Sequence, residues 1–135
     1  MTPRRPNWPP LLAGYFAARR NMPFAWGVHD CCQFARRAIE AITGTDPAAA
    51  WDLPVYSTAL PALRYLRAQG GLEALPVKAG FTAIPIARAG RGDIVLADFA
   101  GAPVLGVCAG ALAAFPGKTK LVFVPTLQCR GAWRV

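Results

Sequence analysis

The sequence predicts a single α+β domain in which N-terminal helices pack on a C-terminal antiparallel sheet. Two observations support this fold class. Apolar residues in the first half recur at three- and four-residue intervals between helix-capping residues, whereas the second half consists of short apolar segments separated by glycine and proline. The chain has 135 residues, of which 54% are hydrophobic and 16% charged, which is enough for one core and excludes an intrinsically disordered protein.

The first helix is predicted to open at Pro9 and Pro10, because proline fits the first helical turn, where its missing N–H is not needed. Apolar residues follow at helical spacing, and the helix is expected to end near the arginine pair at residues 19–20. Residues 1–10, which are rich in proline and arginine, are expected to form a flexible basic arm ahead of a single domain over residues 11–135.

Two further helices follow. Asp30 is a good N-cap for a helix over residues 31–42, and Gly44 is placed to end it. A third helix is predicted from near residue 57 to residue 69, with the glycine pair at residues 70–71 as its stop. The leucines of this helix that are expected to face inward are Leu60, Leu63 and Leu66.

The second half changes from helical to strand-like patterning. Short apolar segments punctuated by glycine or proline are typical of an antiparallel meander. The predicted strands are residues 93–99, 104–108, 111–115, 121–124 and 132–135. Helices followed by antiparallel strands define the α+β class.

The charge balance points to an acidic partner. The chain has 15 basic and 7 acidic residues and a net charge of +8, which favours either an anionic partner or an acidic neighbouring subunit. So few charged residues on so apolar a chain also indicate that partners cover part of its surface, as in an assembly component. Nucleic acid is not the expected partner, because no stacking-aromatic platform or recognition motif accompanies the arginines. No membrane span is expected, since the long uncharged stretch that includes residues 101–117 is broken by glycine and proline.

The four cysteines are Cys31, Cys32, Cys108 and Cys129. A chain of this size forms a core without disulfides, and adjacent cysteines bridge only with strain, so a reducing cytoplasmic origin is expected. The four thiols are also potential ligands for a metal or an iron–sulfur cluster, but no C-x-x-C pair is present. No cofactor or metal is expected from this chain alone, and a site shared with a partner chain stays open.

The stretch most informative about chemistry is His29-Asp30-Cys31-Cys32, at the predicted start of the second helix. A cysteine in the first helical turn lies at the positive end of the helix dipole and near unpaired N–H groups, and both favour the nucleophilic thiolate. The alternative is that these cysteines simply pack in the core.

Three stretches, in this order, resemble the NlpC-type cell-wall peptidases, a papain-like superfamily. Residues 23–27, followed by Asp30 and Cys31, are similar to the family's aromatic, Trp-Gly and Asp-Cys signature. Residues 91–96 are similar to the Gly-Asp strand that precedes the family's histidine, and residues 105–110 to the end of its His-Val-Gly-Ile motif. The resemblance implies a papain-like, NlpC-type fold in which Cys31 is the nucleophile, at the start of a helix packed on the sheet.

The chain departs from this family at the general base. The alignment places Val104 where the family has its catalytic histidine. Without an imidazole to accept the thiol proton, efficient acyl transfer is not expected. His29 is the one histidine of the chain, two residues before Cys31, and is a candidate displaced base.

The Trp-Gly-x-His-Asp-Cys opening, the Gly-Asp strand and the ending at residues 133–135 also resemble small proteins encoded among phage and prophage tail-tip genes. The resemblance implies a virion protein: a catalytically degenerate, pseudoenzyme member of the NlpC-like fold that serves structurally in a bacteriophage or prophage tail tip or baseplate. It would be made in the bacterial host cytoplasm and would join other tail-tip or baseplate proteins in a hetero-complex. The alternative is an active cysteine peptidase or amidase that cleaves peptidoglycan peptides, with Cys31 as nucleophile and His29 or a partner's residue as base.

Overall fold

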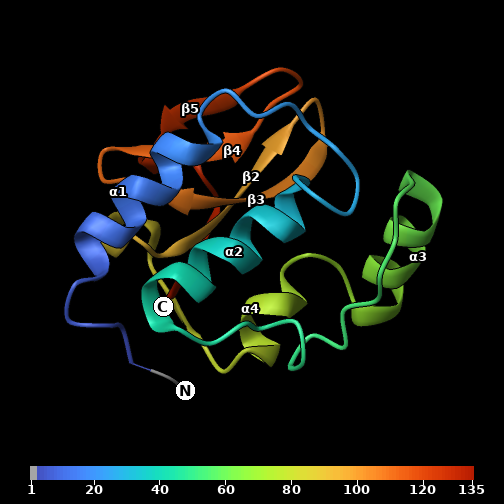
Figure 1. The fold of residues 1–135 in the computed structure, drawn as a ribbon, viewed down its shortest axis with the longest axis horizontal. Helices are drawn as coiled ribbons and strands as arrows, with labels where there is room; N and C mark the ends of the chain where they lie inside the picture. The colour runs from blue at the N-terminus through green and yellow to red at the C-terminus, as the bar shows by residue number, and fades with distance from the viewer. Residues whose placement is uncertain (1–2) are drawn as a thin grey trace.

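Within residues 3–135, which the structure describes, the computed structural model has four α-helices and a six-stranded antiparallel sheet (Figure 1). The helices are α1 (Trp8–Arg19), α2 (Cys31–Thr43), α3 (Ala59–Gln69) and α4 (Ala74–Lys78). The strands are β1 (Thr82–Ile84), β2 (Ile94–Phe99), β3 (Ala102–Cys108), β4 (Leu112–Pro116), β5 (Leu121–Pro125) and β6 (Gly131–Arg134). Two 3-10 segments lie between strands: η1 (Ile86–Arg88) and η2 (Thr126–Gln128). The predicted α+β class, with N-terminal helices on a C-terminal antiparallel sheet, is confirmed.

The strand order in the sheet is β1-β6-β2-β3-β4-β5. Strands β2 to β5 form the predicted meander, and the β2–β3 hairpin pairs Ile94 with Val107 at one end and Phe99 with Ala102 at the other. Its two-residue turn is Ala100-Gly101, and both residues have positive φ, 52° and 80°, as a turn matched to strand twist requires. Strand β6, predicted as the fifth strand of this meander, instead returns to pair with β2 and β1, so it lies inside the sheet.

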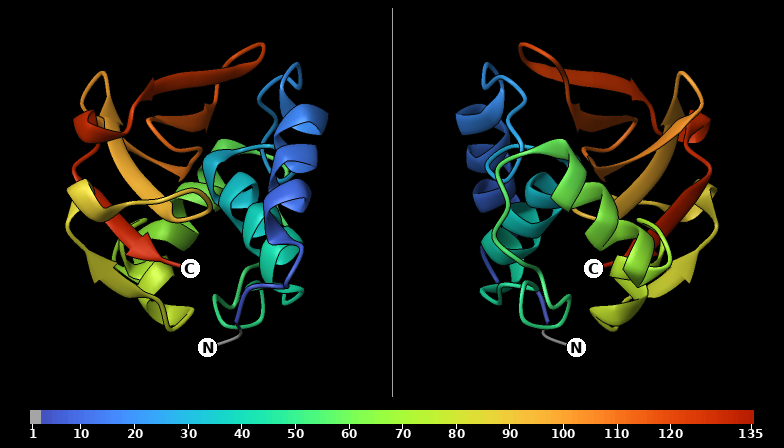
Figure 2. Two further views of the ribbon diagram at one scale, coloured as in Figure 1. Left: turned by 90° about the vertical axis from the view of Figure 1, so that its left-hand side faces the viewer. Right: turned by 90° about the vertical axis from the view of Figure 1, so that its right-hand side faces the viewer.

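Helix α2 is central and lies between α1 and the sheet (Figure 2). Most of its apolar residues are buried, and Phe34 and Ile42 have no exposed surface. On the α1 side, the ring of Tyr15 lies 5.5 Å from that of Phe34, and its hydroxyl donates a 2.8 Å hydrogen bond to the Phe34 carbonyl. The burial of so many apolar side chains makes α2 the main link between the helices and the sheet.

The two faces of the sheet carry separate core clusters, because successive side chains of a strand point to opposite faces. On β3, Leu105 and Val107 belong to the cluster that includes α2 and Leu12 of α1. Val104 and Cys108 of the same strand pack in a second cluster on the other face, with Cys129. This alternation decides which β3 residues can face Cys31.

The orientation of α3 differs from the sequence prediction. Leu60 and Leu63, expected to face inward, are 57% and 54% exposed. Ala62 is buried instead, and Leu66 packs partly buried against the main core. Periodicity places apolar residues on one face, but it does not decide which face the rest of the chain covers.

The N-terminal segment, predicted to be a flexible arm over residues 1–10, is packed against the domain over its described part. The Arg5 N–H donates to the Ile42 carbonyl at 2.7 Å, and α1 already begins at Trp8. Arg4 donates to the Asp93 carboxylate at 2.8 Å and to the main-chain oxygen of Val135 at 2.9 Å. These contacts form because Asp93 offers a buried carboxylate that the arginine neutralises; residues 1 and 2 lie outside the described residues.

Among residues 3–135, none of the helices has the length and apolar character needed to cross a membrane.

Candidate functional site around Cys31

Cys31 is the first residue of α2, directly after the N-cap. Asp30 Oδ1 accepts from the N–H of Gln33 at 2.8 Å, which is the capping hydrogen bond predicted from the sequence. Its Oδ2 accepts from the N–H of Gly27 and from the Tyr56 hydroxyl, both at 2.9 Å. One buried carboxylate therefore holds together the helix start, the preceding loop and the segment that carries Tyr56.

Gly27 explains the Trp-Gly part of the motif. Its φ is +80°, and a Cβ built on it would lie 1.9 Å from the carbonyl oxygen of Tyr56. No side chain fits this close approach of two backbone segments. The glycine is thus required to bring Tyr56 against Asp30.

The Cys31 thiol is protonated at neutral pH. Burial among apolar atoms raises its pKa to about 11, and the negative charge of Asp30 acts in the same direction. Backbone N–H groups of Leu105, Cys32 and Cys31 itself lower the pKa, but by less. The helix start thus supplies the expected N–H groups, while the apolar surroundings outweigh them.

Leu105, the neighbour of Val104, is the β3 residue that faces this thiol. Leu105 is fully buried in the cluster against which Cys31 packs. Its backbone N–H lowers the pKa of the Cys31 thiol. Val104 points to the opposite face of the sheet. The β3 side chain that faces the thiol is therefore aliphatic and offers no proton acceptor.

His29 lies in the contact between α1 and α2. Its ring is fully buried, 5.7 Å from the Phe34 ring in a T-shaped arrangement, and its Nδ1 lies 3.3 Å from an Arg19 nitrogen. Burial and the positive charge of Arg19 both lower the His29 pKa, so the imidazole is neutral at physiological pH. Within the described residues its Nε2 has no hydrogen-bond partner, so neither ring nitrogen is bonded to Cys31.

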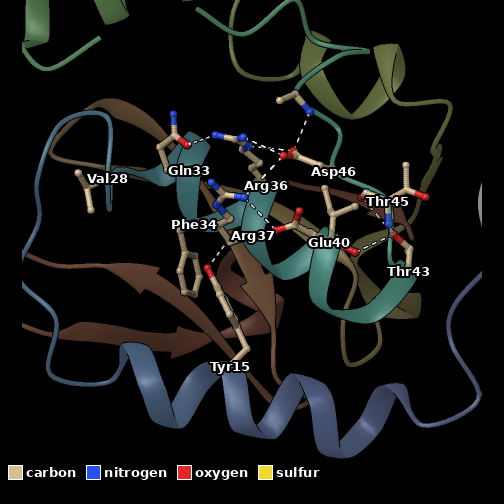
Figure 3. A network of polar contacts seen from close by, with 12 residues as sticks. Tyr15, Val28, Gln33, Phe34, Arg36, Arg37, Glu40, Thr43, Thr45 and Asp46 are labelled. Atoms are coloured by element: carbon tan, nitrogen blue, oxygen red, sulfur yellow. Dashed lines mark hydrogen bonds and ion pairs between the residues drawn. The ribbon is translucent and has the colours of Figure 1, made fainter. Parts of the chain in front are cut away.

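A polar network connects α2 to the loop that follows it (Figure 3). Arg36 donates to both carboxylate oxygens of Asp46 at 2.8 Å and to the Gln33 side-chain oxygen at 2.9 Å. The hydrogen bonds from Arg36, together with its positive charge, lower the pKa of Asp46 to about 2. Arg37 pairs with Glu40 at 2.9 Å and with Asp46 at 3.6 Å. These ion pairs fix the loop that follows α2, and none of them includes Cys31.

The four cysteines do not come together. Cys31 and Cys32 pack on the helix side of the sheet, whereas Cys108 and Cys129 pack on the other face, and all four are free thiols. In the described part of the chain, no group of three or more histidine, cysteine or acidic side chains is arranged to hold a metal ion.

Three cavities are described, and neither Cys31 nor His29 lines any of them. One of about 230 Å³ lies between the end of α2 and the following loop, beside Ile39 and Phe81. A second, of about 340 Å³, lies beside Arg4 and Trp8, and a third, of about 450 Å³, lies on α3. Local sequence patterns did not predict these cavities, because a cavity depends on which distant residues pack beside it.

Comparison with known protein families gives a match over almost the whole chain. The family model described as "Domain of unknown function (DUF6950)" matches residues 3–135. Neither the curated proteins nor the solved structures include a match to the chain.

Proposed function

The chain belongs to the DUF6950 family, and we propose that it is a non-enzymatic structural component of a bacteriophage or prophage tail tip, with a catalytically degenerate NlpC-type fold. The motif order in the sequence supports the fold assignment, and the environment of Cys31 supports the loss of catalysis. In this proposal the protein acts as one subunit of a hetero-complex in the virion.

The observation that carries the proposal is the environment of the Cys31 thiol. The thiol has a pKa of about 11 and faces an aliphatic β3 residue. The histidine of the chain contacts Arg19 instead of Cys31. A cysteine peptidase needs a thiolate or a base that generates one, and an acid that protonates the leaving amine. Among residues 3–135, the histidine supplies neither group to Cys31.

The surface supports an assembly role. Leu60, Leu63, Val77 and Leu127 are each more than half exposed, although the domain is small and strongly basic. Exposed apolar residues on a small domain are often covered by partners. An excess of arginine favours acidic partner surfaces, because its guanidinium forms bidentate pairs with carboxylates.

The alternative, an active peptidoglycan peptidase or amidase, requires a base for Cys31. The position of Cys31 at a capped helix start favours it, but His29 is held by Arg19 on the α1 side of α2. The peptidase alternative therefore requires that a partner chain supply the base for Cys31.

Two measurements test the proposal. The purified protein should release no product from peptidoglycan or D,L-peptide substrates, with an active NlpC-type enzyme as positive control. Turnover that is lost in Cys31→Ser would overturn the non-enzymatic role, and its loss in His29→Gln as well would identify His29 as the base.

Quantitative mass spectrometry of purified tail particles tests the location. A fixed copy number per particle is expected. Absence of the protein from intact particles would contradict the tail role whatever its activity.

A further inference from the structure

Four side chains form one continuous stripe on the outer side of α3, which we call the α3 face: Leu60, Leu63, Arg64 and Arg67. Positions i, i+3, i+4 and i+7 lie on one side of a helix and extend over about 10 Å. The four side chains line a groove of about 450 Å³, and both leucines are more than half exposed. Figure 1 shows α3 at one side of the molecule, away from α1 and the sheet.

The position of α3 does not depend on these four side chains. The helix is anchored through its other side, where Ala62 is buried, Leu66 packs against the core and the Tyr65 hydroxyl donates to the Trp51 carbonyl. Gly70, with φ of 95°, ends the helix in the left-handed conformation. The exposed leucines therefore contribute little to the fold, and their exposure calls for another explanation.

The charge of the α3 face determines which occupant fits it. Helix α3 contains no acidic residue, and Arg64 and Arg67 form no ion pair within the described residues. A second copy of the chain would bring four guanidinium groups together across the contact, which disfavours a symmetric dimer. A segment with apolar side chains flanked by carboxylates would fill the groove and give each arginine a bidentate partner.

We propose that the α3 face is a docking site for an acidic amphipathic helix of a partner protein. Two turns of such a helix match the length of the stripe and place leucine-like side chains against Leu60 and Leu63. Its glutamates or aspartates pair with Arg64 and Arg67. This inference deepens the proposed role as an assembly subunit and rests on it for the identity of the partner, but the surface is tested without tail particles.

The probe is a fluorescent 18-residue peptide with leucines at helical spacing and glutamates on both sides of the leucine stripe. A matched peptide has lysine in place of every glutamate. Binding to the full chain is measured by anisotropy at low and moderate salt. We expect saturable binding of the acidic peptide, weakened by salt, and at least tenfold weaker binding of the lysine peptide.

Two double variants locate the site. Arg64→Glu/Arg67→Glu and Leu60→Ser/Leu63→Ser should each weaken binding of the acidic peptide at least tenfold. The control, Arg20→Glu/Arg88→Glu, makes the same charge change at exposed arginines outside α3 and should weaken binding less than threefold. Because all these side chains are exposed, each variant should keep the thermal midpoint of the parent, which circular dichroism verifies.

The inference is overturned if the acidic peptide does not bind, if the control variant loses as much affinity as the α3 variants, or if the leucine variant binds normally. A dimer in solution that Leu60→Ser/Leu63→Ser dissociates would also overturn it and would make a second copy the occupant. If the protein binds the peptide at α3 but is absent from tail particles, the tail role is refuted and the docking site is retained. If the protein is present in tail particles but does not bind the peptide, the docking site alone is refuted.

Discussion

The Cys31 thiol is subject to two opposing effects. N–H groups at the start of α2 and on β3 favour the thiolate, whereas burial and the adjacent Asp30 carboxylate disfavour it. Burial and the Asp30 charge outweigh the N–H groups and raise the pKa of the thiol to about 11. At Cys31, the N–H groups of the helix start are therefore not enough to activate the thiol.

This pKa predicts how Cys31 reacts. Alkylation by iodoacetamide, followed by peptide mass spectrometry, should accelerate about tenfold per pH unit from pH 7 to 10, because the thiolate fraction rises in that proportion. Cys32, Cys108 and Cys129 are buried and should react later than the partly exposed Cys31. A rate that is already constant between pH 6 and 8 would show a thiolate at neutral pH and would favour the peptidase alternative.

The carboxylate of Asp46 makes stability depend on pH. Its pKa is about 2 in the folded chain against an ordinary value of 3.8, chiefly because Arg36 donates to it. A lowered pKa stabilises the fold at pH values above that of the unfolded carboxyl, and this contribution is lost as pH falls from about 4 toward 2. The shift of nearly two units corresponds to roughly 2 kcal/mol, less some solvent screening of a partly exposed pair.

Asp46→Asn should therefore reduce the free energy of unfolding by about 1–2 kcal/mol at pH 7, because the amide keeps the shape but loses the charge. Urea titrations at pH 7, 5 and 3 measure the difference from the parent, which should be constant at pH 7 and 5 and smaller at pH 3. A difference that does not change with pH would assign the loss to hydrogen-bond geometry instead of charge.

At the scale of elements, α2 begins where it does because of Asp30. Its carboxylate caps the helix and also accepts from Gly27 and Tyr56. Asp30→Ala should lower the free energy of unfolding by about 2–4 kcal/mol, since the cap is lost and the buried Tyr56 hydroxyl loses an acceptor. Denaturant unfolding measures this loss.

The matched control is Thr58→Ala at the start of α3. Thr58 occupies the N-cap position but makes no side-chain capping hydrogen bond. Its replacement should change stability by less than about 0.5 kcal/mol. Equal losses at the two positions would contradict the special role of Asp30.

At the scale of the whole molecule, the chain ends of the described structure meet at Asp93. This carboxylate is 1% exposed and accepts from Arg4 and Arg134, and from the N–H groups of Gly90 and Val135. Arg4 also lies 4.3 Å over the ring of Trp8. One buried acidic group therefore connects the segment before α1, the start of β2 and the end of β6.

Asp93→Ala should destabilise the fold by about 3–5 kcal/mol, because it removes the buried partner of Arg4 and four hydrogen bonds. Arg4→Ala should cost about 1–3 kcal/mol, since Arg134 still neutralises the carboxylate. The control is Arg5→Ala, whose exposed side chain forms none of these contacts and should change stability by less than about 0.5 kcal/mol. If all three variants unfolded at the parent's denaturant midpoint, the segment before α1 would not be part of the folded unit.

Features that depend on neighbouring residues could be predicted from the amino-acid sequence. Helical periodicity, the Asp30 cap and the glycine stops predicted α1 to α3, and the punctuated apolar segments predicted strands β2 to β6 to within about three residues. The position of Cys31 at the start of α2 followed from the same local signals. Caps, turns and periodicity act within a few residues, so they are readable before the chain folds.

Which surfaces pack together became known from the three-dimensional structure. It placed β6 beside β2, turned Leu105 and not Val104 toward Cys31, and set His29 against α1. It also buried Ala62 of α3 in place of Leu60 and Leu63, and closed the N-terminal segment onto Asp93 through Arg4. Each of these arrangements depends on packing or ion pairing between residues that are distant in the sequence. Local sequence patterns therefore do not predict them.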